Sequence, residues 1–296
     1  MINQGTFFGT LLDLWKLTKP RVIGMVLVTT VTGFIVAAGG EQFSHLLLLA
    51  LAVLGTGLAG GGSTMLNNYL ERESDALMLR TKGRATASGR VEPNLVLAVG
   101  VLMVIAGVAL LAATVNLLTA FLVLLTAFIY VLVYTPLKKI TWLNTSVGAV
   151  TGALPIMAGW TAYANNLKPG AWILFGILYL WQHPHVFAVY WMYREDYAAG
   201  GYKMLPVIDP SGRRSFRQAI LFSLALIPVS IALTFFGLTG GVYLVGAVFL
   251  GAALLATSLT LAQRRTMRDA KRVMLMSLIY LPSLLLLIIL DGGLVR

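Results

Sequence analysis

LLLLALAVLGTGLAGGGSTML, residues 46–66, is an apolar run that continues directly into the polar stretch NNYLERESD, residues 67–75. The run is long enough to cross a bilayer as one helix, which needs about 20 residues. Three bases, Arg80, Lys82 and Arg84, follow within ten residues of the last acid. Ionisable groups that continue a membrane helix are costly and usually functional. The sequence therefore predicts a membrane helix whose polar end carries the chemistry.

The composition of the rest of the chain is that of a membrane protein. Of its 296 residues, 58% are hydrophobic and 11% charged, with a mean hydropathy of +0.84. The apolar runs are continuous, whereas the strands of a membrane β-barrel alternate apolar and polar positions. We therefore expect an all-α, polytopic membrane protein that forms a single domain over residues 1–296. Nine membrane-spanning helices are predicted, near residues 22–40, 46–66, 94–113, 117–135, 143–162, 171–192, 218–237, 241–262 and 273–290.

The basic residues predict which way the chain is oriented. Of the 22 Lys and Arg, all but Lys168 and Arg296 fall in the N-terminal segment or in the loops after predicted helices 2, 4, 6 and 8. By the positive-inside rule, the N-terminus is cytoplasmic and the C-terminus periplasmic. The functional cytoplasmic loops are then about 67–93 and 193–217. Met1–Pro20 lacks the features of a signal peptide, so the internal helices are expected to target the chain.

Charge and cysteine content exclude several functions. Topology and anionic lipid headgroups account for the net charge of +11, so nucleic-acid binding is not expected, whereas contact with membrane lipids is. The chain has no cysteine, which excludes disulfides, thiolate catalysis and metal sites built on Cys ligands. No glycine-rich Walker loop occurs, which counts against nucleotide hydrolysis.

The acids after the second predicted helix form a regular column. Asn67, Glu71 and Asp75 are spaced i, i+4, i+8, which places them on one helical face with about 40° of drift per step. One amide and two carboxylates suit a hard cation such as Mg²⁺. The alternative is that these acids merely pair with bases such as Arg72 and Arg80 in a solvated loop. The glycines before the column, at 57 and 60–62, would allow a close helix approach.

Metal-binding acids followed by bases suit a diphosphate group. Mg²⁺ bridges phosphate oxygens, and Arg and Lys neutralise the charge that grows on a leaving group. An allylic diphosphate also needs an apolar space for its isoprenoid tail, which this chain can supply. The sequence thus favours a prenyl diphosphate as one substrate.

Several motifs, taken in order along residues 14–210, carry a family resemblance. The column and these segments resemble the UbiA superfamily of intramembrane prenyltransferases, in particular its protohaem IX farnesyltransferase branch. The segments are Leu17-Thr18-Lys19-Pro20-Arg21, Met78-x-Arg80-Thr81-x-x-Arg84, Tyr134-Thr135-x-Leu137-Lys138, Gly152-Ala153-x-Pro155, Trp181-Gln182-x-Pro184-His185-x-Phe187, and Asp196-Tyr197 with Met204-Leu205-Pro206-Val207.

The resemblance implies a UbiA-like bundle, a reaction and a location. The reaction is Mg²⁺-dependent transfer of the farnesyl group from farnesyl diphosphate to a vinyl group of haem b, giving haem O and diphosphate. The protein would lie in a bacterial inner membrane with its site facing the cytoplasm. Haem A synthase or a terminal oxidase would take the product.

The resemblance also assigns residues to the site. Asn67, Glu71, Asp75 and Asp196 would be the catalytic metal ligands. Diphosphate or the haem propionates would be contacted by Arg72, Arg80, Lys82, Arg84, Lys138 and Arg194. Glu71 stands where the family usually has Asp, which keeps the charge but adds a methylene. No acid stands at Gly200, where a second aspartate would repeat, so Asp196 is the main acid of the second loop.

Two histidines flank a proline in the sixth predicted helix. His183 and His185 are two residues apart and do not share a helical face. Either they cap a helix broken at Pro184, or they contact the haem, with His185 favoured over His183. Covalent haem attachment is excluded because no Cys is present.

Other functions remain open. The same site would serve a UbiA-type enzyme that prenylates an aromatic or quinone-precursor acceptor. A transporter would place ionisable residues at midplane depth, whereas the acids here cluster at one interface. A purely structural membrane subunit would not need a column of acids followed by bases.

Overall fold

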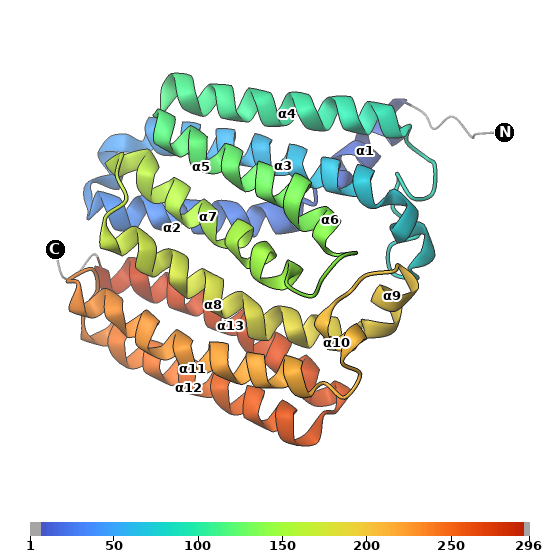
Figure 1. The fold of residues 1–296 in the computed structure, drawn as a ribbon. Helices are drawn as coiled ribbons and strands as arrows, with labels where there is room; N and C mark the ends of the chain where they lie inside the picture. The colour runs from blue at the N-terminus through green and yellow to red at the C-terminus, as the bar shows by residue number, and fades with distance from the viewer. Residues whose placement is uncertain (1–6, 293–296) are drawn as a thin grey trace.

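A computed structural model of the chain describes residues 7–292, except for the side chain of Gln42. Residues 1–6 and 293–296 lie outside it, as do the expectations for the extreme N-terminus and for Arg296. Within the described range the chain is helical and contains no strand, so the predicted all-α class is confirmed. The long helices lie side by side in one bundle (Figure 1). The helices are α1 (Phe7–Leu17), α2 (Pro20–Ala38), η1 (Glu41–His45), α3 (Leu46–Leu77), α4 (Pro93–Thr114), α5 (Leu117–Phe128), η2 (Ile129–Tyr134), α6 (Thr135–Leu137), α7 (Asn144–Ala164), α8 (Pro169–Met192), α9 (Arg194–Ala199), α10 (Leu205–Ile208), α11 (Arg213–Phe235), α12 (Gly241–Arg264) and α13 (Met267–Gly292).

The predicted number of membrane helices is only partly confirmed. Seven helical segments between residues 7 and 292 are long and apolar enough to cross a bilayer. Helices α7 and α8 occupy the other two predicted positions and have 21 and 24 residues. Side chains of these two helices, such as Thr151 and Gln182, line a cavity in the interior of the bundle. The chain is thus an integral membrane protein, but the predicted count of nine spans is not confirmed.

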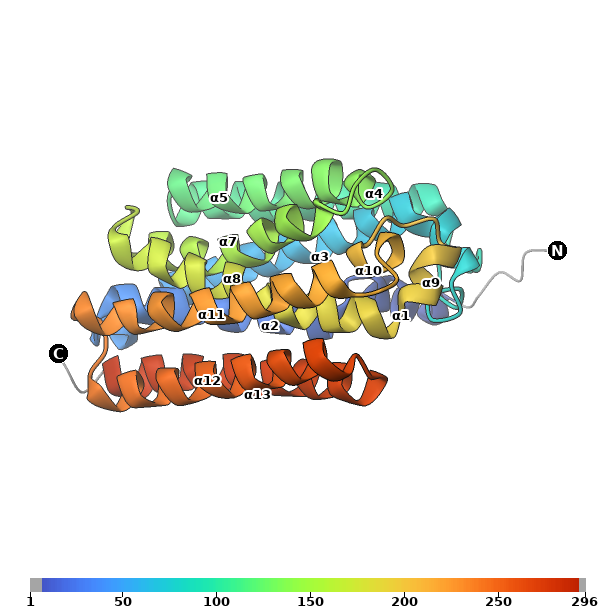
Figure 2. The ribbon, with the colours of Figure 1, turned by 60° about the horizontal axis from the view of Figure 1, so that its bottom comes forward.

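The bundle is layered around α7 and α8. Helix α3 packs on α4, α2 packs on α7, and α8 packs on α7, α11 and α13. Helices α4 and α5 lie on one side of the bundle, and α12 and α13 lie on the opposite side (Figure 2). The core therefore runs through the middle of the bundle between α2, α7 and α8.

Glycine allows the closest helix contact at α3. A Cβ atom added at Gly62 would lie 2.5 Å from the carbonyl oxygen of Gly100 in α4. Such an approach needs a residue without a side chain. The expectation that glycines ahead of the column bring helices together is confirmed at Gly62, which fixes α3 against α4 one turn before Asn67.

Two departures from the predicted boundaries shape the site. Helix α3 does not end with its apolar run at residue 66 but continues to Leu77, so the whole acid column stands on one rigid helix. The segment before Pro136 forms a π-helix, η2, because proline lacks the N–H of a regular turn and crowds the preceding turn. This turn places Thr135 beside α3, where its hydroxyl accepts a hydrogen bond from Asn67 Nδ2 at 3.0 Å.

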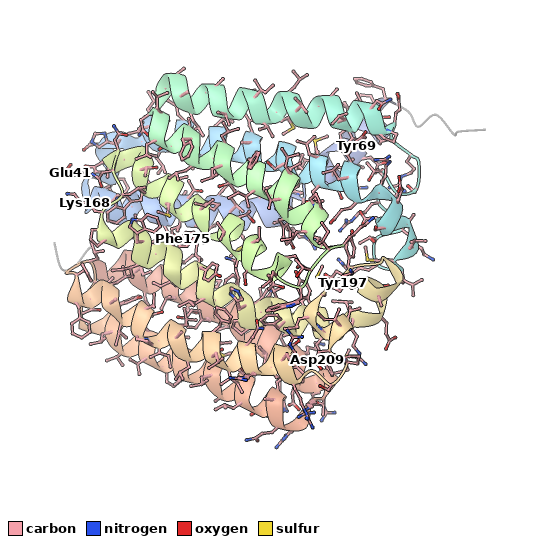
Figure 3. All side chains as sticks on the ribbon, viewed as in Figure 1. Glu41, Tyr69, Lys168, Phe175, Tyr197 and Asp209 are labelled. Atoms are coloured by element: carbon pink, nitrogen blue, oxygen red, sulfur yellow. The ribbon has the colours of Figure 1, made fainter. Side chains whose placement is uncertain are left out.

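The loops that carry the predicted site lie at one end of the bundle. Tyr69 of α3 and Tyr197 of α9 lie at this end, and Glu41 and Lys168 lie at the other (Figure 3). The described ends of the chain, in α1 and at the close of α13, also lie at opposite ends of the bundle (Figure 1). The structure thus brings the two predicted functional loops together.

Candidate active site

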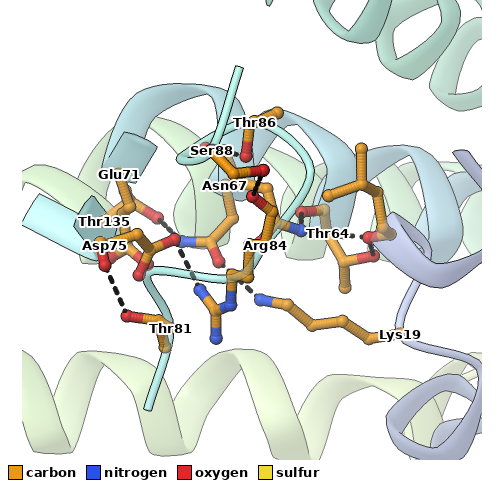
Figure 4. A network of polar contacts seen from close by, with 12 residues as sticks. Lys19, Thr64, Asn67, Glu71, Asp75, Thr81, Arg84, Thr86, Ser88 and Thr135 are labelled. Carbon is orange, nitrogen blue, oxygen red and sulfur yellow. Dashed lines mark hydrogen bonds and ion pairs between the residues drawn. The ribbon is translucent and has the colours of Figure 1, made fainter. Parts of the chain in front are cut away.

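The column on α3 is buried. Asn67, Glu71 and Asp75 have exposed fractions of 1%, 6% and 0%. Buried ionised groups are costly unless paired. The interpretation of this stretch as a solvated charged loop is therefore wrong. Figure 4 shows the three side chains on the same face of α3, as their spacing predicts.

Each member of the column contacts a base from a different segment. Lys19 donates to Asn67 Oδ1 at 2.8 Å. Lys138 Nζ lies 2.7 Å from Glu71 Oε1, and Arg84 Nη1 lies 2.6 Å from Asp75 Oδ2. Lys19 precedes α2 and Arg84 lies in the loop after α3 (Figure 4), and Lys138 directly follows α6. The acids do pair with bases, but not with Arg72 or Arg80.

The donor set of the column fits a hard metal ion. Asp75 Oδ1 is buried and has no hydrogen-bond partner among the described atoms, and leaving such an acceptor unpaired is costly. Carboxylate and amide oxygens of Glu71 and Asn67 stand beside it on α3. Within the described part of the chain, no three His, Cys, Asp or Glu side chains gather, so a site here would rest on two acids and one amide. This is a combination that Mg²⁺, which usually keeps several waters, accepts.

Lys19 is the site residue that the sequence interpretation missed. It is a non-glycine residue with φ of 50°, directly before Pro20, and this left-handed conformation is disfavoured for most residues. The bend turns its side chain to Asn67. Burial, together with the neighbouring charge of Arg84, lowers the pKa of Lys19 to about 7. The sequence signal for Lys19 was its place in the Leu17–Arg21 motif. Its charge alone was explained as one of the cytoplasmic bases that set the membrane topology.

The Lys138 side chain is largely buried in the site, which is unusual for a lysine. Its ammonium group is 4.4 Å from the centre of the Tyr134 ring, a cation–π distance. Burial acts to lower the pKa of Lys138, but the adjacent Glu71 carboxylate more than offsets this and holds the pKa above its usual value. Lys138 therefore stays a cation at any assay pH, in contrast to Lys19.

Asp196 connects the second loop to the first. Its carboxylate accepts hydrogen bonds from the backbone N–H groups of Leu79 at 3.0 Å and Arg80 at 3.2 Å. The guanidinium of Arg80 then lies over the rings of Tyr193 and Tyr197, at 5.3 and 5.7 Å from their centres. Helix α9 and its flank thus hold the Arg80 turn in place. The role of Asp196 as a metal ligand stays a prediction.

Three of the predicted substrate-binding bases do not contact the column. Arg72 donates to the carbonyl oxygen of Tyr69 and stacks on its ring. Arg194 donates to the carbonyl oxygen of Trp191, with its guanidinium over that ring. Lys82 is exposed. The structure brings Arg84 and Lys138 to the column and does not bring these three there.

The two histidines of α8 lie in a continuous helix. Pro184 is inside α8, which runs unbroken to Met192, so the expectation of caps on a broken helix is wrong. His183 is buried, with its Nδ1 2.8 Å from the Tyr179 carbonyl oxygen. His185 Nδ1 lies 2.8 Å from Ser277 Oγ on α13. Haem contact by either residue stays a prediction.

An apolar cavity adjoins the column. It has a volume of about 250 Å³ and is walled by α2, α3, α5, η2, α7 and α8. Thr64, Tyr130 and Tyr134 line the end nearest the column, and Thr56, Val123 and Pro155 line it further along their helices. A molecule with a charged head at the column could therefore extend an apolar chain into the bundle.

These features define an integral membrane protein with a buried charged site beside an apolar cavity. The sequence profile of the UbiA prenyltransferase family matches residues 26–280. The protoheme IX farnesyltransferase of Solibacter usitatus (strain Ellin6076) is 42% identical, with 94% of this chain and 98% of that protein covered. The protein of the same name from Salinibacter ruber (strain DSM 13855 / M31) is 43% identical, with the same coverage of both chains. The chain belongs to the UbiA prenyltransferase family, and it is a prenyltransferase.

Solved structures agree with this fold. A digeranylgeranylglyceryl phosphate synthase superposes with a TM-score of 0.79 at 16% identity, covering 96% of this chain and 99% of that one. A UbiA homolog from Archaeoglobus fulgidus bound to DMAPP and Mg²⁺ superposes with a TM-score of 0.66 at 15% identity, covering 94% and 99%. The expected UbiA-like bundle is thereby confirmed.

Proposed function

We propose that this protein transfers the farnesyl group of farnesyl diphosphate to a vinyl group of haem b, giving haem O and diphosphate. The observation that carries the proposal is the buried acid–base column beside an apolar cavity. Ionising an allylic diphosphate needs charge stabilisation at its head and a dry space for its tail. The relatives named protoheme IX farnesyltransferase, which align with 94% of this chain, support haem as the acceptor.

A magnesium ion would be held by Asn67, Glu71 and Asp75, with Asp196 as the predicted ligand from the second loop. When bound, it stabilises the negative charge that develops on the diphosphate. The unpartnered, buried Asp75 Oδ1 supports this placement. So does the all-oxygen donor set.

The bases of the column complete the headgroup site. Lys19, Arg84 and Lys138 would shift part of their hydrogen bonding to phosphate oxygens as the carbon–oxygen bond breaks. Loss of diphosphate leaves an allylic cation, which the vinyl carbon attacks. Water then adds to the resulting cation on the porphyrin side chain and releases a proton. The apolar walls of the cavity keep water from the farnesyl cation before that attack.

The setting of the reaction follows from the charge pattern. The bases concentrate at the end of the bundle that holds the column, which supports a cytoplasm-facing site in a bacterial inner membrane. Lipids would surround the apolar helix faces. The haem O product would pass to haem A synthase or directly to a terminal oxidase.

The mass of the haem extracted after turnover tests the proposal. Membranes that contain the protein, supplied with haem b and farnesyl diphosphate, should form a more hydrophobic haem heavier by one farnesyl group and one hydroxyl group. Formation should require Mg²⁺. If no such haem forms while an aromatic or quinone-precursor acceptor is prenylated, the assignment of haem as acceptor is wrong.

A further inference from the structure

A second pocket lies beside the column, on the side of α1. It has a volume of about 320 Å³ and is formed by α1, the start of α2 and the loop after α3. Lys19 and Arg84 belong to both this pocket and the column. We name it the α1 pocket. Its charged lining residues are Asp13, Lys16, Lys19, Arg80, Arg84 and Arg90.

The charged residues of the α1 pocket differ in the partners that they contact. Arg90 donates to Asp13 Oδ2 at 3.0 Å and to the carbonyl oxygen of Gly83 at 3.1 Å. This pair fastens α1 to the loop after α3. Asp13 is paired with Arg90 and Arg84 with Asp75, so Lys16, Lys19 and Arg80 leave the pocket with a net positive charge.

Two of the bases, Arg80 and Lys16, have hydrogen-bond donors that are available to a ligand. The guanidinium of Arg80 makes no hydrogen bond within residues 7–292, and its position is set by the rings of Tyr193 and Tyr197. Lys16 lies 3.9 Å from Asp13 and its side chain is 63% exposed. A guanidinium held in place with free donors is prepared for a carboxylate or phosphate, since little ordering remains to be done on binding.

The outer face of α1 places the pocket at the membrane surface. Phe7, Phe8, Leu11, Leu12 and Trp15 are all exposed. A short helix with this apolar face and a basic end lies in the interface between headgroups and acyl chains. The pocket behind α1 therefore opens where a molecule dissolved in the bilayer would present its anionic groups.

We propose that the α1 pocket binds the propionate carboxylates of the porphyrin acceptor, with Arg80 and Lys16 as their contacts; this rests on the proposed function. The reaction brings together two anionic substrates, and the site has two sets of bases. Lys138 lies outside the α1 pocket, next to Glu71. The diphosphate is thus assigned to the column, whose cavity receives the prenyl chain. Lys19 and Arg84 form the boundary between the two substrates.

Separate Michaelis constants for the two substrates test this proposal on the purified full-length protein. Arg80→Gln and Lys16→Gln should each raise KM for haem b about tenfold, the loss expected for one charge-assisted hydrogen bond. KM for farnesyl diphosphate should stay unchanged. The dimethyl ester of haem b, which lacks the carboxylate charges, should be a poor acceptor for the wild type, and the variants should not weaken its use further. Arg268→Gln removes an exposed charge from α13 and should change nothing.

Other outcomes would overturn the proposal. If the variants raise KM for farnesyl diphosphate instead, the pocket holds the diphosphate. An equal loss with the ester would show that the bases act only through packing. If the loss occurs in vesicles with phosphatidylglycerol and disappears in pure phosphatidylcholine, the pocket binds a lipid headgroup. Failure of the wild type to farnesylate haem b would remove the proposed function and this proposal together. Lys16 is on the surface, so its variant should fold even if Arg80→Gln does not.

Discussion

Arg84 Nη1 lies 2.6 Å from Asp75 Oδ2, while the other oxygen of the same carboxylate is buried and has no hydrogen-bond partner among the described residues. One residue thus faces a cation from the loop after α3 and offers a free acceptor on its other side. The Asp75 side chain is 1% exposed and that of Arg84 is 26% exposed. A carboxylate held in this way combines a fixed position with an open lone pair, which is what a metal ligand requires.

Asp75→Asn should abolish Mg²⁺-dependent turnover. The change keeps the size of the side chain but removes the charge that both Arg84 and a metal ion need, so we expect kcat to fall at least about 100-fold. The measurement is the initial rate of farnesylated haem formation, with size-exclusion chromatography in detergent to confirm that the variant is intact. Glu73→Gln is the matched control, because Glu73 lies on the same helix but its side chain is 81% exposed. Wild-type activity in Asp75→Asn would contradict the placement of the metal at the column.

The pH dependence of kcat/KM for farnesyl diphosphate should reveal the protonation state of Lys19. Its pKa is lowered from 10.5 to about 7, so the side chain is a cation below about pH 7 and neutral above it. The value of kcat/KM for farnesyl diphosphate, which reflects ionisations of the free enzyme, should fall as the pH rises through this value. Lys19→Arg keeps the charge at all these pH values and should remove that fall.

The ionisation of the diphosphate itself affects wild type and variant equally, so the difference between their profiles isolates Lys19. Lys19→Gln should show low kcat/KM throughout. If the profiles of the wild type and Lys19→Arg coincide, the amine of Lys19 does not titrate in this range or does not contact the donor.

Local periodicity made the column predictable, but not its partners. Asn67, Glu71 and Asp75 share a face because α-helix geometry fixes it, and the apolar runs located the long helices. Lys19 and Lys138 are 48 and 67 positions away from their partners on α3. Those contacts depend on the left-handed turn at Lys19 and on the π-helix before Pro136, which no hydrophobic pattern predicts.

Glu71 also shows that the sequence predicts a site residue but not its partner. The sequence marks it as a departure from the family, and the structure gives the extra methylene a function, since the longer side chain meets Lys138 Nζ at 2.7 Å. The place of Asp196 also could not be foreseen, because its acceptance of the Leu79 and Arg80 amides depends on how two loops far apart in sequence pack together.

Asp196→Asn separates the two roles open to this residue. As a metal ligand it contributes charge, so the Mg²⁺ concentration for half-maximal activity should rise about tenfold. The Asn side chain keeps one oxygen acceptor for one of the two backbone amides, so the Arg80 turn should loosen less than when both acceptors are removed. Glu195→Gln removes a neighbouring charge whose side chain is 91% exposed and should leave the Mg²⁺ requirement unchanged.

Hydrogen exchange completes that comparison. Asp196→Ala removes both acceptors and should speed exchange of the Leu79 and Arg80 amides. If Asp196→Asn has the Mg²⁺ requirement of the wild type while Asp196→Ala loosens these amides, Asp196 positions Arg80 and does not bind the metal.

The far end of the apolar cavity should set the length of the prenyl chain. Val123 lines the cavity and is 5% exposed, whereas its neighbour Leu124 is 47% exposed on the outer face of α5. Val123→Phe fills space that the terminal isoprene unit would occupy, and loss of even one methylene contact changes kcat/KM about tenfold or more. The ratio of kcat/KM for geranyl diphosphate to that for farnesyl diphosphate should therefore rise at least about tenfold. Leu124→Phe adds a ring on the lipid side of the same helix and should leave the ratio unchanged. If both variants change the ratio equally, or neither does, the farnesyl chain does not lie in this cavity.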